Sequence, residues 1–240
     1  MSLDLFTITG IGLIVGTFLS YLIQYIKLYK NKNNDGISYF MLVLGCISSM
    51  TNFVGLTSVE TYYKNVLVLP LIQIMTPWIC IFIFYSMFLY YSRKNYKIKY
   101  FTESLLIYTK PFDYNEYKKH KYVFFSYILF TISLWFLFYV FKNKYNANLY
   151  YYGQSMNIIA SITSIIMWMP QIIESYKLRE PKSLSILALA IHSLGCFITF
   201  VYQVFMNNQT ILVGFPYLLG GLLEVCVILL ATNKICKIRK

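Results

Sequence analysis

The feature that most constrains the fold of this chain is an internal repeat. The segment from Gln171 to Ser185 has a counterpart 147 residues earlier, from Gln24 to Ser38, and five of the fifteen aligned positions are identical without a gap. Both copies also carry a Tyr-Lys pair between the glutamine and the serine. Such self-similarity at a fixed offset indicates that two related structural units follow one another along the chain.

The composition places these units in a membrane. Hydrophobic residues make up 58% of the 240 residues and charged residues only 12%, which leaves too little polar surface to cover a soluble globule. A bilayer core requires about 20 apolar residues per helix. The sequence offers seven such stretches, at about 5–25, 37–57, 66–91, 123–141, 149–176, 184–206 and 211–233.

The basic residues predict how the chain crosses the bilayer. A net charge of +12 would suggest nucleic acid as the partner of a soluble protein, but 18 of the 21 Lys and Arg lie in three alternate connections and the C-terminal tail, at 27–32, 93–121, 177–182 and 234–240. The opposite side has only Lys64, Lys142 and Lys144. The positive-inside rule therefore places the N-terminus outside or in a lumen and the C-terminus in the cytosol, with the lipid bilayer rather than nucleic acid as partner.

The repeat and the apolar stretches together predict an all-α polytopic membrane protein. The offset maps the first three stretches onto the last three, and a three-helix unit is odd, so the fourth stretch is needed to return the second copy to the same orientation. This is a 3+1+3 arrangement of parallel repeats. We expect a first unit at 1–91, a cytosolic loop with a linker helix at 92–147, and a second unit with a short tail at 148–240.

The second copy resembles the PQ-loop repeat family, which includes cystinosin, lysosomal cationic amino-acid exporters, the SWEET carriers and KDEL receptors. The residues that carry the resemblance are Pro170-Gln171, Tyr176-Lys177 and Ser183-Leu184-Ser185. The first copy departs from the pattern because Ile23 stands where the family has proline. The resemblance implies a seven-helix carrier in a lysosomal, vacuolar or other endomembrane. It also implies that Pro170 is a hinge and that the adjacent glutamine lies next to the substrate route.

Polar and aromatic residues recur at helical spacing on one face of the fifth stretch and, less completely, of the first. Because an uncompensated polar group is costly in lipid, these faces should point toward the bundle interior or water. We expect a substrate path formed by Gln24, Asn157, Gln171, Trp168, Tyr21 and Asn52. The alternative is that such residues pack helices together, as small and hydroxyl-bearing residues often do, and for Asn52 this includes a close-packing seam with neighbouring glycines.

Two ionisable residues within apolar stretches are candidates for proton coupling. Glu224 is a carboxyl group deep in the last stretch, where the apolar surroundings favour its neutral form unless a cation approaches. His192 is a histidine within a stretch and titrates near neutral pH. For both, the alternative is a structural hydrogen bond to a neighbouring helix. No Lys or Arg lies within a stretch, so a neutral, zwitterionic or cationic solute fits better than an anion.

These features predict a secondary transporter for a small polar, amino-acid-like metabolite, coupled to protons through the two candidates above. The alternative is a non-transporting receptor or accessory protein on the same scaffold, such as a KDEL receptor or the dolichol-sugar utilisation factor. An enzyme is not expected: the sequence shows no metal-ligand spacing, no nucleophile with a recognisable base and no phosphate-binding glycine loop, and it implies no cofactor.

Overall fold

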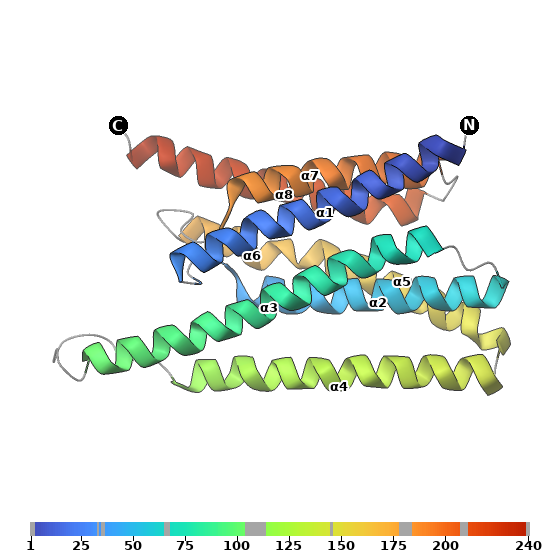
Figure 1. Ribbon diagram of the computed structural model, residues 1–240, viewed down its shortest axis with the longest axis horizontal. Coiled ribbons are helices and arrows are strands. Elements are labelled where there is room, and N and C mark those ends of the chain that lie inside the picture. The colour runs from blue at the N-terminus through green and yellow to red at the C-terminus, as the bar shows by residue number, and fades with distance from the viewer. Residues whose placement is uncertain are drawn as a thin grey trace.

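The computed structural model describes residues 3–32, 34, 37–64, 68–103, 114–144, 146–177, 184–206 and 211–238. All elements in these ranges are helical (Figure 1). They are α1 Leu3–Asn31, α2 Tyr39–Tyr63, α3 Val68–Glu103, α4 Tyr114–Lys144, α5 Asn146–Ile166, α6 Trp168–Lys177, α7 Ile186–Val201, the π-helical turn η1 Tyr202–Met206 and α8 Ile211–Ile238.

The helices have the length and composition of a multi-pass membrane protein. Within the described residues, five segments are long and apolar enough to cross a bilayer: Thr7–Asn31, Tyr39–Tyr63, Val68–Ser92, Tyr117–Lys144 and Ala147–Tyr176. Two shorter apolar helices, Ile186–Val201 and Tyr217–Asn233, occupy the last two predicted stretches. Many large apolar side chains remain exposed on these helices, as expected for surfaces that face lipid.

Corresponding helices of the two copies run in matching directions. In Figure 1, α1 and α5 both run from right to left, whereas α2 and α7 both run from left to right. The packing also corresponds, because α2 contacts α5 where α1 contacts α7. Within the first copy α3 contacts α1 and α2, and within the second α8 contacts α6 and α7. The contacts of α3 in the first half of the chain thus correspond to those of α8 in the second half.

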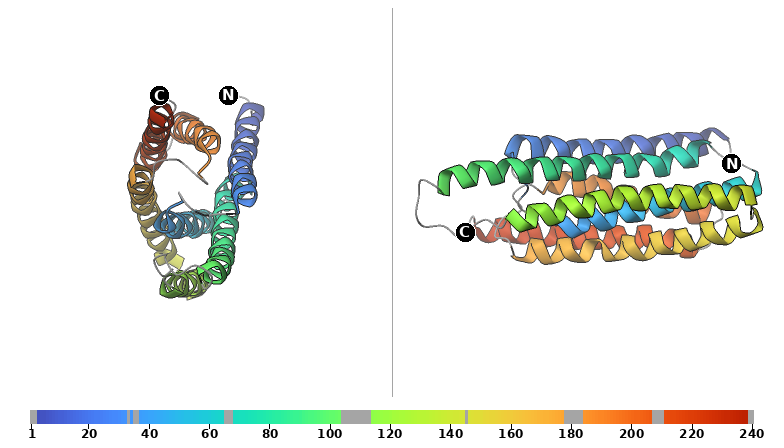
Figure 2. Two further views of the ribbon diagram at one scale, coloured as in Figure 1. Left: turned by 90° about the vertical axis from the view of Figure 1, so that its left-hand side faces the viewer. Right: turned by 90° about the horizontal axis from the view of Figure 1, so that it is seen from below.

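Among the five long apolar segments, that of α2 is the most buried and that of α4 the least. Half of the most apolar part of the α2 segment is buried, compared with 11% of that of the α4 segment. The α2 side chains Leu42, Cys46, Met50 and Val54 are fully buried in the hydrophobic core. Viewed along the bundle, α4 lies at the edge opposite α1 and α7 (Figure 2). The centre of the protein is therefore formed by the contacts of α2 with α5 and α6.

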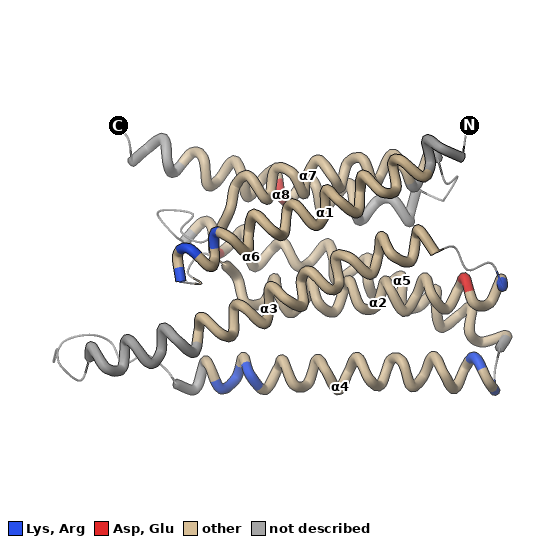
Figure 3. The backbone as a smooth tube through the Cα atoms, viewed as in Figure 1, with Lys and Arg blue, Asp and Glu red and all other residues tan. Residues whose placement is uncertain are grey.

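The described charged residues gather at the ends of the bundle (Figure 3). The middle of the bundle is almost free of them, apart from an acidic residue in α8. This distribution is what a bilayer requires, because a charge near its centre is costly unless it is paired.

The fifth apolar stretch is not one continuous helix. α5 ends at Ile166 and α6 begins at Trp168, with a turn at Met167 between them. Pro170 lacks the N–H that would bond the Ile166 carbonyl, and its ring clashes with that carbonyl, so the break falls where the proline disturbs the helix. By contrast, α1 has Ile23 at the equivalent position and continues unbroken for 29 residues.

Candidate functional site

Each repeat glutamine reaches the start of a helix in the other copy. Gln24 Oε1, on α1, accepts a hydrogen bond from the backbone N–H of Ser185 at 2.7 Å. Gln171 Oε1, on α6, accepts one from the backbone N–H of Ser38 at 2.8 Å. Ser38 and Ser185 are the N-cap residues of α2 and α7. The backbone N–H of a residue at the start of a helix has no hydrogen-bond partner within that helix. We call these two bonds the glutamine clasps.

The two clasps are equivalent and both are buried. Gln24 and Gln171 occupy matching repeat positions, as do Ser38 and Ser185, so each bond is the counterpart of the other. Gln171 is fully buried and Gln24 is 6% exposed. A buried N–H left without a partner costs about 1–3 kcal/mol, so the clasps hold the two copies together at this end of the bundle.

The first clasp has an additional contact that the second cannot form. The Lys27 ammonium donates a hydrogen bond to the Leu184 carbonyl, next to Ser185. The equivalent residue in the second copy is Glu174, whose carboxylate has no hydrogen to donate. The lysine contact therefore supports only the first clasp, between α1 and α7, whereas in the second clasp Gln171 Nε2 donates a hydrogen bond to Ser175 Oγ at 3.2 Å.

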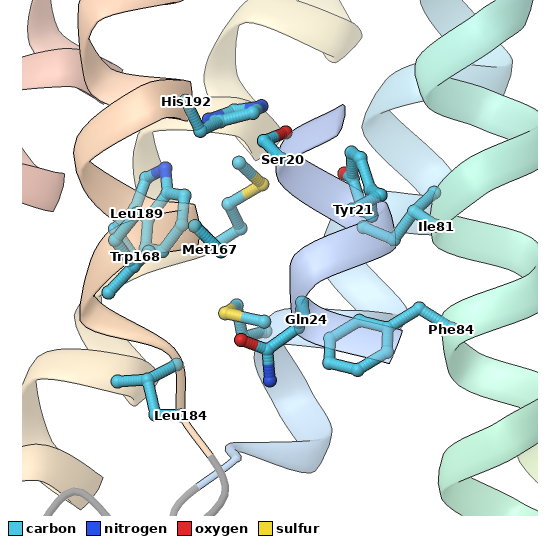
Figure 4. Close-up of a pocket in the computed structure, with 12 residues that line it drawn as sticks. Ser20, Tyr21, Gln24, Ile81, Phe84, Met167, Trp168, Leu184, Leu189 and His192 are labelled. Atoms are coloured by element: carbon cyan, nitrogen blue, oxygen red, sulfur yellow. The ribbon is translucent and has the colours of Figure 1, made fainter. Parts of the chain in front are cut away.

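A cavity lies directly beside the clasps, between the two copies. Figure 4 shows Trp168, Leu189 and His192 on one side of this space and Tyr21, Ile81 and Phe84 on the other. It is lined by Ser20, Tyr21, Gln24, Met41, Ile81, Phe84, Met167, Trp168, Leu184, Ala188, Leu189 and His192. Six of these residues come from the first copy and six from the second.

The cavity is small and mostly apolar in this conformation. Its volume is about 70 Å³. Pockets that hold small ligands usually measure roughly 300–1,000 Å³. In the described conformation the cavity is therefore smaller than a usual ligand pocket.

The two candidates for proton coupling lie in direct contact at the wall of this cavity. His192 Nδ1, on α7, is 2.7 Å from Glu224 Oε1, on α8, and Glu224 is fully buried. The Tyr21 and His192 rings are nearly perpendicular, with their centroids 6.0 Å apart. His192 lines the cavity and contacts the buried carboxyl group of Glu224, which is not itself a lining residue. The role of this pair in proton coupling stays a prediction.

The thiol group of Cys196 lies next to the pair formed by His192 and Glu224. Cys196 Sγ lies 3.8 Å from His192 Nδ1 and 4.0 Å from Glu224 Oε1. Together the three residues offer nitrogen, sulfur and oxygen ligand atoms within 4.8 Å of one another, which is a spacing that a metal ion could bridge. Glu224 Oε2 is buried and has no hydrogen-bond partner among the described residues.

The structure divides the expected substrate path into two groups. Gln24, Tyr21 and Trp168 line the cavity, while Gln171, Asn157 and Asn52 are not among its lining residues.

Asn157 and Asn52 lie in the contacts that α2 makes with its neighbours. The Asn157 side chain covers Gly55 so closely that a Cβ built on that glycine would fall 2.1 Å from Asn157 Oδ1. Asn52 lies beside Tyr217 of α8.

Sequence reasoning missed that Ser38 and Ser185 stand at the N-cap positions of α2 and α7, and it missed the proximity of Cys196 to His192 and Glu224. The i, i+4 spacing of His192 and Cys196 places both on one face of α7 and could have suggested that they act together. Glu224 lies 28 residues beyond Cys196, on another helix, so no local spacing reveals the third member. The apolar lining residues Met41, Ile81 and Phe84 carried no signal that distinguished them from the rest of the core.

A protein-family model matches the chain in both copies of the repeat. The family model described as PQ loop repeat matches residues 5–59 and again residues 152–212. The two matches contain the two glutamine clasps, Pro170 and most of the cavity lining. No curated protein and no solved structure matches the sequence.

Proposed function

We propose that this chain, which belongs to the PQ-loop repeat family, is a secondary carrier that moves a small polar metabolite across an endomembrane by alternating access. The observation that carries the proposal is the cavity between the copies, to which each copy contributes six of the twelve lining residues. A space shared equally by two related units can open to one side or the other when the units rock against each other.

The proposed architecture is two parallel three-helix units joined by α4. It is supported by the matching directions of α1 and α5, by the equivalent contacts within each copy, and by the peripheral position of α4. We place the N-terminus in the lumen and the C-terminus in the cytosol, because the basic residues concentrate in the alternate connections. Lysosomal or vacuolar location is proposed from the family alone.

In this proposal the glutamine clasps form the cytosolic gate. Gln24 is followed three residues later by Lys27, the first residue of a basic connection, so this end of the bundle faces the cytosol. While both clasps are closed, the ends of α2 and α7 remain attached to the opposite copy. Opening toward the cytosol requires that these bonds break, and the helix break at Met167 lets α6 move without bending all of α5.

The lining limits the class of solute. It supplies polar groups from Ser20, Tyr21, Gln24 and His192, apolar surface from the other residues, and no Lys or Arg among its described members. The nearest carboxyl group, Glu224, is paired with His192. A neutral or cationic amino-acid-like solute therefore matches the cavity better than an anion.

The test is uptake by proteoliposomes that contain the purified protein, measured for a panel of radiolabelled amino acids and sugars. Ala188 is buried at the cavity wall, so Ala188→Phe should fill the space and abolish uptake of the solute that the wild type carries. The matched control is Leu187→Phe, because the adjacent Leu187 is 62% exposed and faces away from the core. Undiminished uptake by a folded Ala188→Phe protein would contradict a route through this cavity.

The second candidate is a receptor or accessory protein on the same scaffold. The observation in its favour is that the cavity, at about 70 Å³, is much smaller than a usual ligand pocket, which a static scaffold would also show. Absence of uptake for the entire panel, by protein that remains monodisperse, would favour this second function over the carrier.

A further inference from the structure

We propose that His192, Cys196 and Glu224 form a binding site for a divalent transition-metal ion of the zinc type, which bridges α7 and α8 at the wall of the cavity. The site lies within the second copy and does not involve the glutamine clasps. It is an addition to the carrier function, since binding of the ion can be measured whether or not the protein moves a solute.

The ligand atoms are already close to the positions that a tetrahedral ion requires. Zinc binds nitrogen and oxygen at about 2.0–2.2 Å and thiolate sulfur at about 2.3 Å, so tetrahedral ligand atoms lie roughly 3.3–3.6 Å apart. Cys196 Sγ is 3.8 Å from His192 Nδ1 and 4.0 Å from Glu224 Oε1. Only the contact between His192 and Glu224, at 2.7 Å, must lengthen, by roughly 0.6 Å.

The unpartnered oxygen of Glu224 is an independent indication of a ligand. Glu224 is fully buried, and its Oε2 has no hydrogen-bond partner among the described residues. A buried carboxyl oxygen without a partner is costly, so such an atom is expected where another group completes the site. An ion held by Oε1 alone would leave Oε2 unpartnered, so in this proposal the Glu224 carboxyl group binds the ion with both oxygens.

The charges of the three ligands cancel the charge of a divalent ion. A thiolate and a carboxylate contribute one negative charge each and a neutral imidazole contributes none, so the complex with a divalent ion has no net charge. A neutral complex is the form that the apolar interior of a membrane protein tolerates best. The Cys196 thiol loses its proton when it binds the ion, and affinity therefore falls in acid.

The types of ligand select the type of ion. Magnesium and calcium prefer sites made of oxygen, whereas a set of imidazole, thiolate and carboxylate favours zinc and its neighbours among the transition metals. Three protein ligands leave a fourth position. Because His192 also lines the cavity, that position is open to water or to a solute that occupies the cavity.

Binding is tested by titration of the detergent-solubilised full chain, purified with a tag that lacks histidine, with zinc by calorimetry and with cobalt by absorption. We expect one ion per protein and a thiolate-to-cobalt charge-transfer band. Cys196→Ser should remove the band, and both Cys196→Ser and Glu224→Gln should weaken zinc binding by about tenfold or more. Cys226→Ser is the matched control, because Cys226 is an exposed cysteine on α8, two residues from Glu224.

The outcomes separate the site from its alternatives. Absence of binding by folded wild-type protein, or a cobalt band that survives Cys196→Ser, would overturn the proposal. In proteoliposomes, zinc should reduce wild-type uptake and leave Cys196→Ser uptake unchanged, since the ion ties α7 to α8. Zinc binding by a protein that moves no solute would support the metal site and reject the carrier function. Uptake by a protein that binds no zinc would support the carrier function and reject the metal site.

Discussion

Gln171 and Ser38 lie 133 residues apart in the sequence, yet the Gln171 amide oxygen accepts the Ser38 backbone N–H at 2.8 Å. Its counterpart joins Gln24 to Ser185 at 2.7 Å. These bonds make the start of the second helix in each copy depend on the first helix of the other. The stability of the two copies is therefore coupled, and the coupling is concentrated in very few atoms.

Removing either clasp should destabilise the protein. Gln171→Ala and Gln24→Ala each leave a buried helix-start N–H unpaired, which costs about 1–3 kcal/mol of unfolding free energy. Thermal unfolding in detergent measures the loss. The control is Gln154→Ala, an amide of α5 that makes no hydrogen bond in the described part of the chain. Equal melting temperatures for the clasp variants and this control would contradict the structural role of the clasps.

The unequal reinforcement of the clasps predicts a specific role for one lysine. Lys27→Met removes the donor to the Leu184 carbonyl and should lower stability by about 1 kcal/mol, because the ammonium is only half-buried and water replaces part of the bond. Lys30→Met, at an exposed position on the same helix, should have no measurable effect. Identical unfolding of the two variants would show that the Leu184 contact contributes nothing.

Pro170 should determine where the fifth apolar stretch is broken. Pro170→Ala restores the missing donor and removes the clash with the Ile166 carbonyl, so we expect α5 and α6 to join into one helix. Hydrogen exchange measured by mass spectrometry should then show slower exchange around Met167. Pro77→Ala is the control, since α3 continues through Pro77 in the described structure. If exchange near Met167 is as fast in Pro170→Ala as in wild type, the proline is not the cause of the break.

The contact between α2 and α5 should tolerate no added methyl group at Gly55. A Cβ there would fall 2.1 Å from Asn157 Oδ1 and 3.0 Å from the Gly153 carbonyl oxygen, so Gly55→Ala should cost about 1–3 kcal/mol. Gly12→Ala is the control, because nothing lies within 4 Å of a Cβ at Gly12.

The same contact discriminates between two roles of Asn157. If Asn157 packs the helices rather than lining the solute route, Asn157→Ala should partly rescue Gly55→Ala and leave the affinity for the solute unchanged. A large change in the apparent KM of uptake with normal stability would instead place Asn157 on the route.

The sequence predicted the repeat, the helical membrane fold and the residues of the shared glutamine motif, because these depend on hydropathy and on identities at a fixed offset. It did not predict which polar residues face one another. Asn157 and Gln24 look alike as amides on apolar helices, but Asn157 lies over Gly55 and Gln24 reaches the cavity. That difference depends on helix rotation and on which neighbour is a glycine, which a single sequence does not specify. Likewise, the sequence indicates Glu224 and His192 only as two separate ionisable residues in apolar stretches. The packing of α7 against α8 brings them into contact.

Each glutamine clasp joins a glutamine of one copy to a serine N–H of the other. A single three-helix unit contains both a glutamine that can reach outward and a serine N–H that can receive it, so two separate copies of one such unit could form the same pair of bonds with each other. In these two bonds the single chain is arranged as a pair of identical units would be. The two halves still differ: Lys27 stands at the position of Glu174 and Ile23 at that of Pro170, so α1 is continuous where the second half has the break between α5 and α6.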